Sequence, residues 1–375
     1  MKVLVAIDSF KGSLSSIQAG NTIKNAILNI KPEAQVIVRP LADGGEGTTD
    51  SLLEGLGGER ILLNVTGPLG STVQASYGYI DSINTVVMEM ASASGITLIS
   101  SAEKNPLLAT SRGTGEMILH ALERGYRNFI IGIGGSATND GGLGMLKALG
   151  WTFLDADGND VGEGAQALSK IASIHADHVH PALSFCTFQI ACDVTNPLCG
   201  PNGATYIYGP QKGVTEDMKE YIDTSMAHYA AQTKDYLHVD HQNTKGAGAA
   251  GGMGFAFCSY LNAKLVPGVE LILRAIHLEK DMFDADILIT GEGRLDHQTA
   301  MGKAPVGVAK LAKKHGLKVI AFAGSVTSDA SVCNDAGIDA FFPIIRGITT
   351  LEEAMDPANA ADNLRATVEQ VFRLL

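Results

Sequence analysis

No apolar run in this 375-residue sequence approaches the ~20 residues that a membrane-spanning helix requires. The first residues are apolar, but Asp8 interrupts them before the apolar core of a signal peptide, about 7–15 residues, is complete. We therefore predict a soluble protein in which residues 3–7 form a buried strand and not part of a leader peptide.

Cysteine pairs and excess positive charge are also missing. The five cysteines include no CxxC pair, and their odd number favours reduced thiols and a cytoplasmic location. The 28 Lys and Arg residues against 40 Asp and Glu residues give a net charge of −12. Because a general nucleic-acid or membrane-surface binder carries a basic patch, we expect neither as a partner. The sequence leaves the oligomeric state open.

Glycine, by contrast, is abundant: average usage near 7% predicts roughly 26 glycines in a chain of this length, and there are 43. Much of the excess lies in loops that also carry Asp, Ser, Thr and Asn. These loops span residues 8–13, 42–48, 132–142 and 290–296. Glycine lets the backbone approach a ligand closely, and free backbone N–H groups bind anions. The loops therefore predict an anion-binding site.

Both ends of the chain show alternating strand and helix patterns, which are typical of a parallel sheet with helices on its faces. The predicted strands are residues 3–7, 35–40, 61–66, 287–290, 319–323 and 340–344, and the predicted helices between and after them include 16–28, 48–56, 305–315, 328–336 and 357–374. Residues 71–80 and 85–90 instead flank a short turn, which indicates an antiparallel hairpin.

These patterns predict an α/β fold with two domains. Residues 1–66 and 285–375 are expected to form one discontinuous, doubly wound α/β domain with a parallel sheet. Residues 67–284 are expected to form a second, inserted domain of mixed α/β type. In open α/β sheets, ligands bind beyond the carboxyl ends of the strands, where several of the glycine-rich loops are predicted to lie.

A common P-loop NTPase is excluded by the missing Walker A motif, because Gly302 and Lys303 are followed by Ala304 in place of Ser or Thr. Residues 246–251 match the dinucleotide fingerprint literally, but polar residues precede them where a buried strand is required. We therefore predict only a phosphate cradle at a helix start there, at residues 251–254.

A second dinucleotide pattern leaves an NAD-dependent enzyme open as an alternative. Gly132, Gly134 and Ala137 follow a predicted strand in a permitted spacing, and Asp155 stands about twenty residues further on. The interior of this segment is unusually polar for a helix start that packs on a strand. The isolated pattern is therefore weak evidence for NAD binding.

Four aspartates stand beside glycines or at predicted strand ends: Asp8, Asp43, Asp193 and Asp296. A single aspartate in such a place is most often a turn or N-cap residue. Four of them at the carboxyl ends of strands favour a shared role, either in holding Mg²⁺ or in accepting a hydroxyl proton.

Two basic residues also lie in glycine-containing loops and not on a charged helix face. Lys11 and Arg294 are therefore candidates for pairing with a phosphate or with a substrate carboxylate. They would supply positive charge locally in a protein whose net charge is −12.

Several motifs, taken together and in order, cover nearly the whole chain. They are residues 8–12, 40–48, 111–115, 132–142, 192–198, 246–254 and 290–299. Together these motifs resemble those of the bacterial glycerate kinases of the type-1 class. None of the charged motif residues is replaced.

The resemblance implies ATP- and Mg²⁺-dependent phosphorylation of D-glycerate, usually on the 2-hydroxyl, to give 2-phosphoglycerate. It implies a flavodoxin-like or Rossmann-like domain built from both chain ends and an inserted mixed α/β domain, with the active site in the cleft between them. Phosphoryl transfer requires positioning and charge neutralisation more than covalent chemistry.

On this basis the candidate residues receive hypothetical roles. The catalytic candidates are Lys11, Asp193 and Asp296, and the substrate-binding candidates are Arg112, Arg294, Ser9 and Thr299. The nucleotide or phosphate candidates are Gly134, Gly135, Ser136, Thr138, Asn139, Gly251 and Gly252, and the metal candidates are Asp43 and Asp193. The division of roles between Asp193 and Asp296 stays open.

Two further readings differ from a kinase. One is the NAD-dependent oxidoreductase of a small hydroxy acid, and the other is a non-catalytic sensor of nucleotides or sugar acids. A sensor would be expected to have lost the charged motif residues, which are present. Phosphorylation of the 3-hydroxyl of glycerate, giving 3-phosphoglycerate, also stays open.

Overall fold

A computed structural model describes residues 1–375 and divides the chain into two units, each built from separate segments. The first unit comprises Met1–Asp43, Asp50–Gly57 and Val269–Leu375, and the second comprises Gly44–Thr49 and Gly58–Gly268. These divisions differ from the expected boundaries after residues 66 and 284. The reason at the first boundary is that strand β3 (Glu59–Thr66) pairs with β4 (Thr72–Ile80) in the second unit.

The sheet of the first unit has five strands, all parallel, in the order β13-β12-β11-β1-β2. The strands are β1 (Lys2–Ile7), β2 (Gln35–Pro40), β11 (Ile287–Leu295), β12 (Lys318–Val326) and β13 (Ala340–Pro343). Numbered by their sequence within this unit, the order is 2-1-3-4-5, the flavodoxin-like arrangement. The predicted fold class is therefore confirmed for this sheet.

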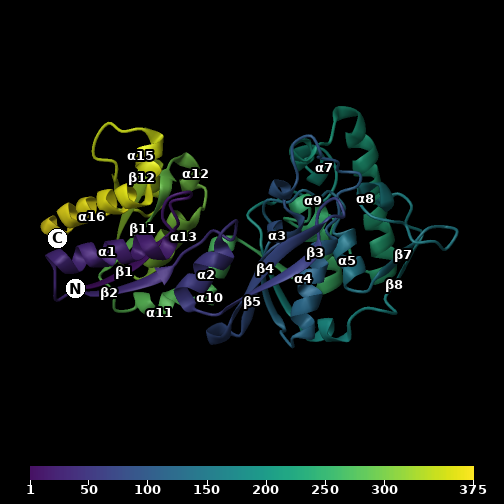
Figure 1. Ribbon diagram of the computed structural model, residues 1–375, viewed down its shortest axis with the longest axis horizontal. Coiled ribbons are helices and arrows are strands. Elements are labelled where there is room, and N and C mark those ends of the chain that lie inside the picture. The colour runs from purple at the N-terminus through teal and green to yellow at the C-terminus, as the bar shows by residue number, and fades with distance from the viewer. The chain divides into compact units, whose positions relative to one another are not determined.

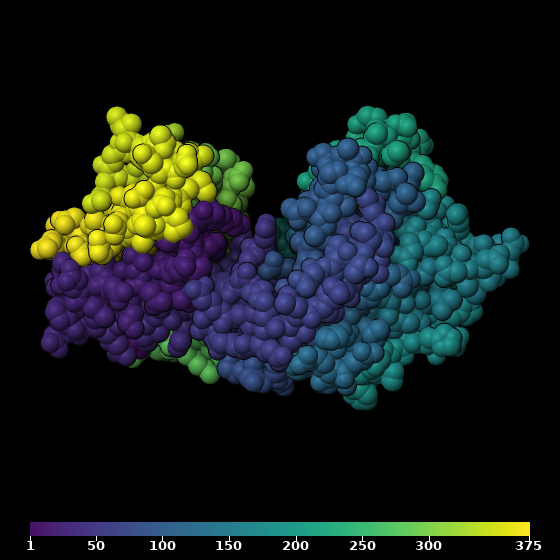
Figure 2. Space-filling view, in the orientation of Figure 1, coloured from purple at the N-terminus to yellow at the C-terminus, as the bar shows by residue number.

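Helices cover both faces of that sheet. Helix α1 (Ser16–Ile30) and the C-terminal helix α16 (Pro357–Leu374) pack together on one face, as Figures 1 and 2 show where the two chain ends meet. Helix α13 (Ala304–Lys314) packs against β11, β12 and β1. Residues 3–7 are fully buried, and because side chains alternate along a strand, both faces of the sheet are covered.

The remaining helices of the first unit are short. They are α2 (Thr48–Leu56), which begins in the second unit, α10 (Gly268–Ala275), α11 (Leu278–Met282), α12 (His297–Ala300), α14 (Val332–Asp335) and α15 (Leu351–Met355). In the whole chain no helix combines the length and the apolar character that crossing a bilayer requires.

The second unit contains a mixed sheet of six strands in the order β10-β9-β6-β5-β4-β3. Its other strands are β5 (Thr85–Glu89), β6 (Asn128–Gly132), β9 (Thr187–Ala191) and β10 (Lys264–Val266). Strands β4 and β5 form the predicted antiparallel hairpin, and β5, β6, β9 and β10 run parallel. A separate two-stranded sheet joins β7 (Thr152–Leu154) to β8 (Ser173–His175).

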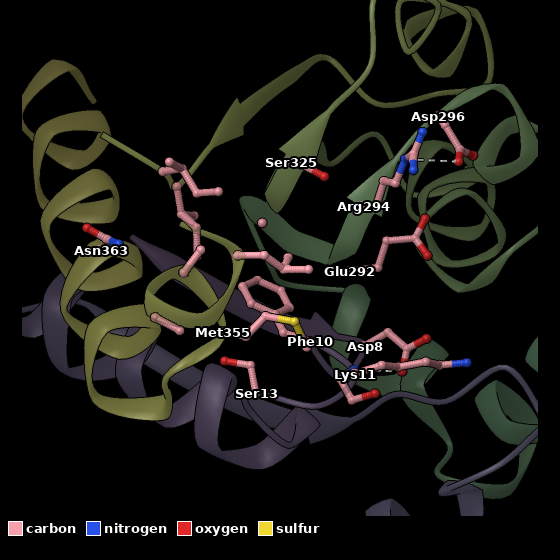
Figure 3. Close-up of a pocket in the computed structure, with 18 of the residues that line it drawn as sticks. Asp8, Phe10, Lys11, Ser13, Glu292, Arg294, Asp296, Ser325, Met355 and Asn363 are labelled. Atoms are coloured by element: carbon pink, nitrogen blue, oxygen red, sulfur yellow. Dashed lines mark hydrogen bonds and ion pairs between the residues drawn. The ribbon is translucent and has the colours of Figure 1, made fainter. Parts of the chain in front are cut away.

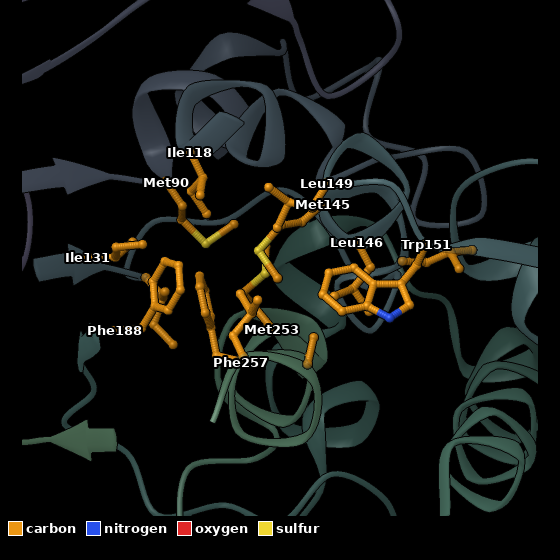
Figure 4. Close-up of a cluster of buried hydrophobic side chains, with 14 of the residues drawn as sticks. Met90, Ile118, Ile131, Met145, Leu146, Leu149, Trp151, Phe188, Met253 and Phe257 are labelled. Carbon is orange, nitrogen blue, oxygen red and sulfur yellow. The ribbon is translucent and has the colours of Figure 1, made fainter. Parts of the chain in front are cut away.

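A methionine- and phenylalanine-rich core lies between this sheet and its helices (Figure 4). The helices are α3 (Ala91–Ser94), α4 (Arg112–Glu123), α5 (Leu143–Ala148), α6 (Ala165–Leu168), α7 (Ala204–Tyr208), α8 (Glu216–Leu237) and α9 (Ala249–Leu261). Phe129 and Phe188 stack with ring centroids 4.8 Å apart, and Met145 and Met253 are completely buried. Flexible methionines fill irregular gaps between such rigid rings.

Helices α4 and α5 approach each other closely because α4 carries glycine at the contact. A Cβ atom at Gly115 would lie 2.4 Å from the carbonyl oxygen of Met145 and 2.8 Å from the Cβ atom of Ala148. Two residues earlier, a Cβ atom at Gly113 would lie 2.1 Å from the carbonyl oxygen of Thr66. The glycines of the 111–115 motif therefore serve helix packing.

Gly115→Ala tests this packing, because the substitution has two opposing effects. Alanine favours the helix by about 1 kcal/mol over glycine, whereas overpacking a close contact costs about 1–3 kcal/mol. Because the clash involves backbone atoms, we expect a net loss in the free energy of unfolding, measured by urea denaturation. Gly347→Ala, where a Cβ atom would meet nothing within 4 Å, is the control. A Gly115→Ala protein at least as stable as wild type would contradict the close packing.

Candidate functional site

A cavity of about 430 Å³ opens in the first unit at the carboxyl ends of its strands (Figure 3). It is lined by the residues that follow β1 and by the last residues of β11. Strand β2 lies on one side of β1, whereas β11 and the later strands β12 and β13 lie on its other side. In doubly wound sheets, ligands bind at such a switch point in the strand order, which here falls between β1 and β11. The fold therefore places the cavity where a ligand site is expected.

Residues 290–296 are mostly strand and not the loop that their glycines predicted. Strand β11 continues to Leu295, and Glu292 pairs with Ala323 and Arg294 with Ser325 of β12. Glycine is required at one point, because a Cβ atom at Gly291 would lie 1.8 Å from the carbonyl oxygen of Phe322. Because Glu292 and Arg294 are two residues apart on a strand, they share one face, and both line the cavity.

Three carboxylates stand together at this edge: Asp8, Asp43 and Glu292. Asp8 is 7% exposed, and its Oδ1 accepts a hydrogen bond from the Ser9 amide at 2.7 Å. Burial, followed by the charge of Asp43, raises the pKa of Asp8 to about 7. Burial also raises the pKa of Glu292, although the Thr299 hydroxyl donates to its Oε1 at 2.5 Å. The mutual repulsion of these groups favours binding of a cation.

Positive side chains line the same cavity. The Lys11 ammonium lies 3.8 Å from Oδ2 of Asp43, and Nε of Arg294 lies 3.7 Å from Oδ2 of Asp296. The side chains of Lys11 and Arg294 are 67% and 66% exposed, and Lys303 is also part of the lining. Exposed cationic groups of this kind can pair with an incoming anion.

The opposite part of the cavity is apolar. Its side chains include Phe10, Ile344, Ile345, Leu351 and Met355, and Figure 3 shows Phe10 and Met355 beside the charged groups. A cavity with one charged part and one apolar part suits a ligand that has the same division.

Asp296 and Thr299 have local structural partners. Asp296 caps helix α12: its Oδ1 accepts from the amides of Gln298 at 2.9 Å and Thr299 at 3.2 Å. Thr299 is fully buried and completes this capping box. Asp296 and Ser9 line the cavity, whereas Thr299 lies behind it and supports Glu292.

A second cavity, of about 250 Å³, lies in the second unit. Its lining includes Gly134, Gly135, Ser136 and Asp193, all of which the sequence singled out, together with Lys212. Oδ1 of Asp193 accepts a hydrogen bond from the Gly268 amide at 3.0 Å. The Lys212 ammonium donates to the Ser136 hydroxyl and to the Thr138 carbonyl oxygen, both at 2.7 Å.

The polar residues at the end of the 132–142 loop lie inside the protein. Thr138, Asn139 and Asp140 are completely buried, and the Asn139 side-chain amide donates to the Thr205 hydroxyl at 3.0 Å. The predicted nucleotide candidates Thr138 and Asn139 therefore lie outside the lining of the cavity.

Asp140 holds this loop in place. Its carboxylate accepts hydrogen bonds from the Ser111 amide and hydroxyl, each at 2.8 Å, and from the amides of Gly142 and Gly144, each at 3.2 Å. Burial nevertheless raises the pKa of Asp140 above its ordinary value. The loop is thereby fastened to the starts of helices α4 and α5.

Gly251 and Gly252 pack against the same loop and not into the cavity. Both have positive φ angles, of 69° and 92°, and a Cβ atom at Gly251 would lie 2.1 Å from the Thr138 carbonyl oxygen. The Gly251 carbonyl oxygen accepts from the Gly141 amide at 2.9 Å. The left-handed turn delays the regular part of α9. Gly251 and Gly252 thus join two loops and lie outside the lining of the cavity.

Arg112 is also paired within the second unit. Its guanidinium lies 2.5 Å from Oε1 of Glu163, and the residue lines neither of the two cavities. The sequence motif around Arg112 thus contributes to loop anchoring through Ser111 and to helix packing through its glycines.

Three residues of the cavities were missed by sequence reasoning. Glu292 lies between Gly291 and Gly293, in the same glycine-containing motif that made Arg294 a candidate, so the motif could have indicated Glu292 as well. Lys303 was considered only as part of a failed Walker A pattern. Lys212 lies in an ordinary Pro-Gln-Lys-Gly turn, and no local pattern indicates that it is buried.

No group of three or more His, Cys, Asp or Glu side chains is arranged to hold a metal ion by itself. Such an arrangement is not needed for Mg²⁺, which is usually bound by one or two carboxylates, with water and substrate phosphates as the other ligands. One or two of the carboxylates Asp8, Asp43 and Glu292, which line the same cavity, could supply those protein ligands.

Comparison with known proteins identifies relatives along the whole chain. Residues 3–375 match the model of the glycerate kinase family. The chain is 47% identical over 373 residues to glycerate 2-kinase of Escherichia coli (strain K12), covering 98% of each chain. It is 45% identical over 371 residues to glycerate kinase of Bacillus subtilis (strain 168), covering 99% of this chain and 97% of that protein.

A solved structure agrees with these relatives. It is the crystal structure of a Salmonella typhimurium LT2 protein that is provisionally described as glycerate kinase 2. It is 46% identical in sequence, and it aligns with a TM-score of 0.92 over 100% of this chain and 98% of that chain. From the match of the family model and the near full-length identity to these relatives, we conclude that the chain belongs to the glycerate kinase family.

Proposed function

We propose that the protein transfers the γ-phosphate of ATP to the 2-hydroxyl of D-glycerate, with Mg²⁺ as cofactor, to give 2-phosphoglycerate and ADP. The observation that carries this proposal is the cavity of the first unit, which combines four carboxylates, three cationic side chains and an apolar wall. This combination suits a magnesium nucleotide, whose base is flat and apolar and whose phosphates are charged.

The apolar wall would hold the nucleotide base, and Lys11, Arg294 and Lys303 would pair with the phosphates. The nucleotide is assigned to this cavity and not to residues 134–139, for which the sequence predicted that role. Volume supports the choice between these two cavities, since this cavity measures about 430 Å³ and the cavity beside Gly134–Ser136 about 250 Å³.

Asp8, Asp43 and Glu292 would hold the magnesium ion or its bound water molecules. When bound there, Mg²⁺ neutralises charge on the transferring phosphate. The raised pKa of Asp8, at about 7, supports this role, because a carboxylate so poorly compensated in the free protein gains most from a nearby cation.

Asp193 is our candidate for the base. As the glycerate oxygen attacks the γ-phosphorus, its proton would pass to the Asp193 carboxylate, and the bond from phosphorus to the β–γ bridging oxygen would break, releasing ADP. Transfer requires that the two substrates meet during turnover. Asp296 would act as a positioning residue, since its carboxylate caps α12 and pairs with Arg294.

The NAD-dependent alternative has less support. It requires Asp155 to bind a ribose hydroxyl, but Oδ1 of Asp155 orders its own turn by accepting from the amides of Asp157 at 3.0 Å and Asn159 at 2.9 Å. The sensor alternative would not need charged groups suited to phosphoryl transfer, and those groups are present.

An assay of ADP release with ATP, Mg²⁺ and D-glycerate tests the proposal. We expect ADP release that depends on both D-glycerate and Mg²⁺, and ³¹P and ¹H NMR of the product that identify 2-phosphoglycerate. No ADP release with D-glycerate or another small hydroxy acid would refute the phosphotransfer reaction. A 3-phosphoglycerate product would refute only the choice of hydroxyl.

The paired variants Asp193→Asn and Asp296→Asn distinguish the base from the helix cap. Asparagine keeps the oxygen that accepts the Gly268 amide in the first case, and it is as good an N-cap as aspartate in the second. We expect kcat to fall about 10²–10⁴-fold in Asp193→Asn, since a general base contributes about that much, and to change only a few-fold in Asp296→Asn. The reverse pattern in steady-state kinetics would exchange the two roles.

Lys11→Ala tests the phosphate contact in the first unit. Because the Lys11 side chain is 67% exposed, solvent screens its charge, and we expect the KM for ATP to rise about 3- to 10-fold. Lys310→Ala, which removes an exposed lysine of α13 outside the cavity, is the matched control and should leave the KM unchanged. Equal kinetics for both variants would remove Lys11 from the nucleotide site.

A further inference from the structure

Lys212 is a buried lysine at the wall of the second-unit cavity, and nothing in the reaction proposed above uses it. We propose that this cavity binds the carboxylate of glycerate, through the Lys212 ammonium and the backbone amides of Gly134, Gly135 and Ser136. The inference rests on the proposed function, since it assigns one of the two substrates of that reaction to one unit.

The environment of Lys212 favours binding of an anion next to its ammonium group. The residue is 2% exposed, and both of its hydrogen-bond partners, the Ser136 hydroxyl and the Thr138 carbonyl oxygen, are uncharged. It forms no ion pair with Asp140, whose carboxylate is occupied by four other donors. A buried charge without a paired counter-charge is costly, and a bound carboxylate would compensate it.

The adjoining loop offers further donors. The amides of Gly134, Gly135 and Ser136 donate no hydrogen bond to another backbone group, whereas the carbonyl oxygen of Gly135 accepts from the Ile96 amide at 2.8 Å and fixes the loop. Gly135 has a φ angle of 70°. Successive amides that alternate between right- and left-handed conformations form a concave nest for anions.

The size and lining of the cavity favour the smaller substrate. About 250 Å³ suits a three-carbon acid. Apolar side chains such as Ile133 and Val194 line part of this cavity, and the Lys212 ammonium lines it together with the backbone of Gly134–Ser136. Asp193 lines the same cavity, so a glycerate held by its carboxylate would bring its hydroxyl groups into the same space as the proposed base.

Substitutions at two positions test the assignment by steady-state kinetics. In Lys212→Met we expect the KM for D-glycerate to rise about 10- to 100-fold, as loss of a charged hydrogen bond implies, with a change of less than about 3-fold in the KM for ATP. Lys212→Arg should restore part of the loss, because it keeps the charge. A general loss of structure would instead affect both substrates.

Gly134→Ala keeps the test decisive if Lys212→Met does not fold. A Cβ atom at Gly134 meets no protein atom within 4 Å, and the same is true at Gly347, which supplies the matched control Gly347→Ala. We expect a methyl group in the nest to raise the KM for D-glycerate about 10-fold, with the melting temperature unchanged. A rise in the KM for ATP instead, or no change for either substrate, would overturn the assignment.

Calorimetry separates this inference from the proposed function. Burial lowers the pKa of Lys212 to about 7, while the charge of Asp140 acts in the opposite direction. Asp193 is the carboxylate in the lining of this cavity. The pKa values of Cys192 and Tyr208, which also line it, are raised, so both stay neutral near pH 7. At pH 8, D-glycerate binding should therefore take up a proton, because a carboxylate favours the ammonium form of Lys212.

We expect the wild-type protein to bind D-glycerate, with proton uptake, and not to bind uncharged glycerol. The proton uptake should disappear in Lys212→Met. If that variant does not fold, the affinity for D-glycerate should fall in Gly134→Ala. Binding that is unchanged in both variants would overturn the inference, even if wild-type protein phosphorylates glycerate. Wild-type protein that binds D-glycerate in this way but releases no ADP would instead refute the proposed function alone.

Discussion

The buried carboxylate of Asp140 is the interaction on which the second unit's site depends. Its four hydrogen bonds join the glycine-rich loop to Ser111 at the start of α4 and to Gly144 at the start of α5. The Ser111 hydroxyl also accepts from the Met145 amide at 3.0 Å. With its polar end held inside the protein, the loop can present its other end, Gly134–Ser136, to the cavity.

The first unit obtains its site from a different constraint, the concentration of like charges at one edge of a parallel sheet. Asp8 directly follows strand β1, and β11 brings Glu292 and Arg294 to the same cavity. Burial of carboxylates near one another is unfavourable in the free protein. Under the proposed function, a bound magnesium nucleotide would relieve this repulsion, so that protein stability would be exchanged for ligand affinity.

Sequence patterns predicted the elements well where apolar runs end at glycine or proline: β2 and α2 have the bounds that were expected. The patterns failed where glycine, which is common in loops, instead occupies a strand at a close contact between backbones. The glycines of residues 290–296 read as a loop, but Gly291 lies in a strand because the backbone of β12 passes too close for a side chain. Lys212 was not predicted because its burial arises from contacts with Ser136 and Thr138, which are distant in sequence.

The central claim is that each unit binds one substrate, the nucleotide in the first and glycerate in the second. A crystal structure with D-glycerate, Mg²⁺ and a non-hydrolysable ATP analogue tests it most directly. The account predicts the glycerate carboxylate within hydrogen-bond distance of the Lys212 ammonium and the Gly135 amide, and the adenine base against Phe10 and Met355. Glycerate bound at Arg294, with the nucleotide phosphates on Gly134–Ser136, would contradict it.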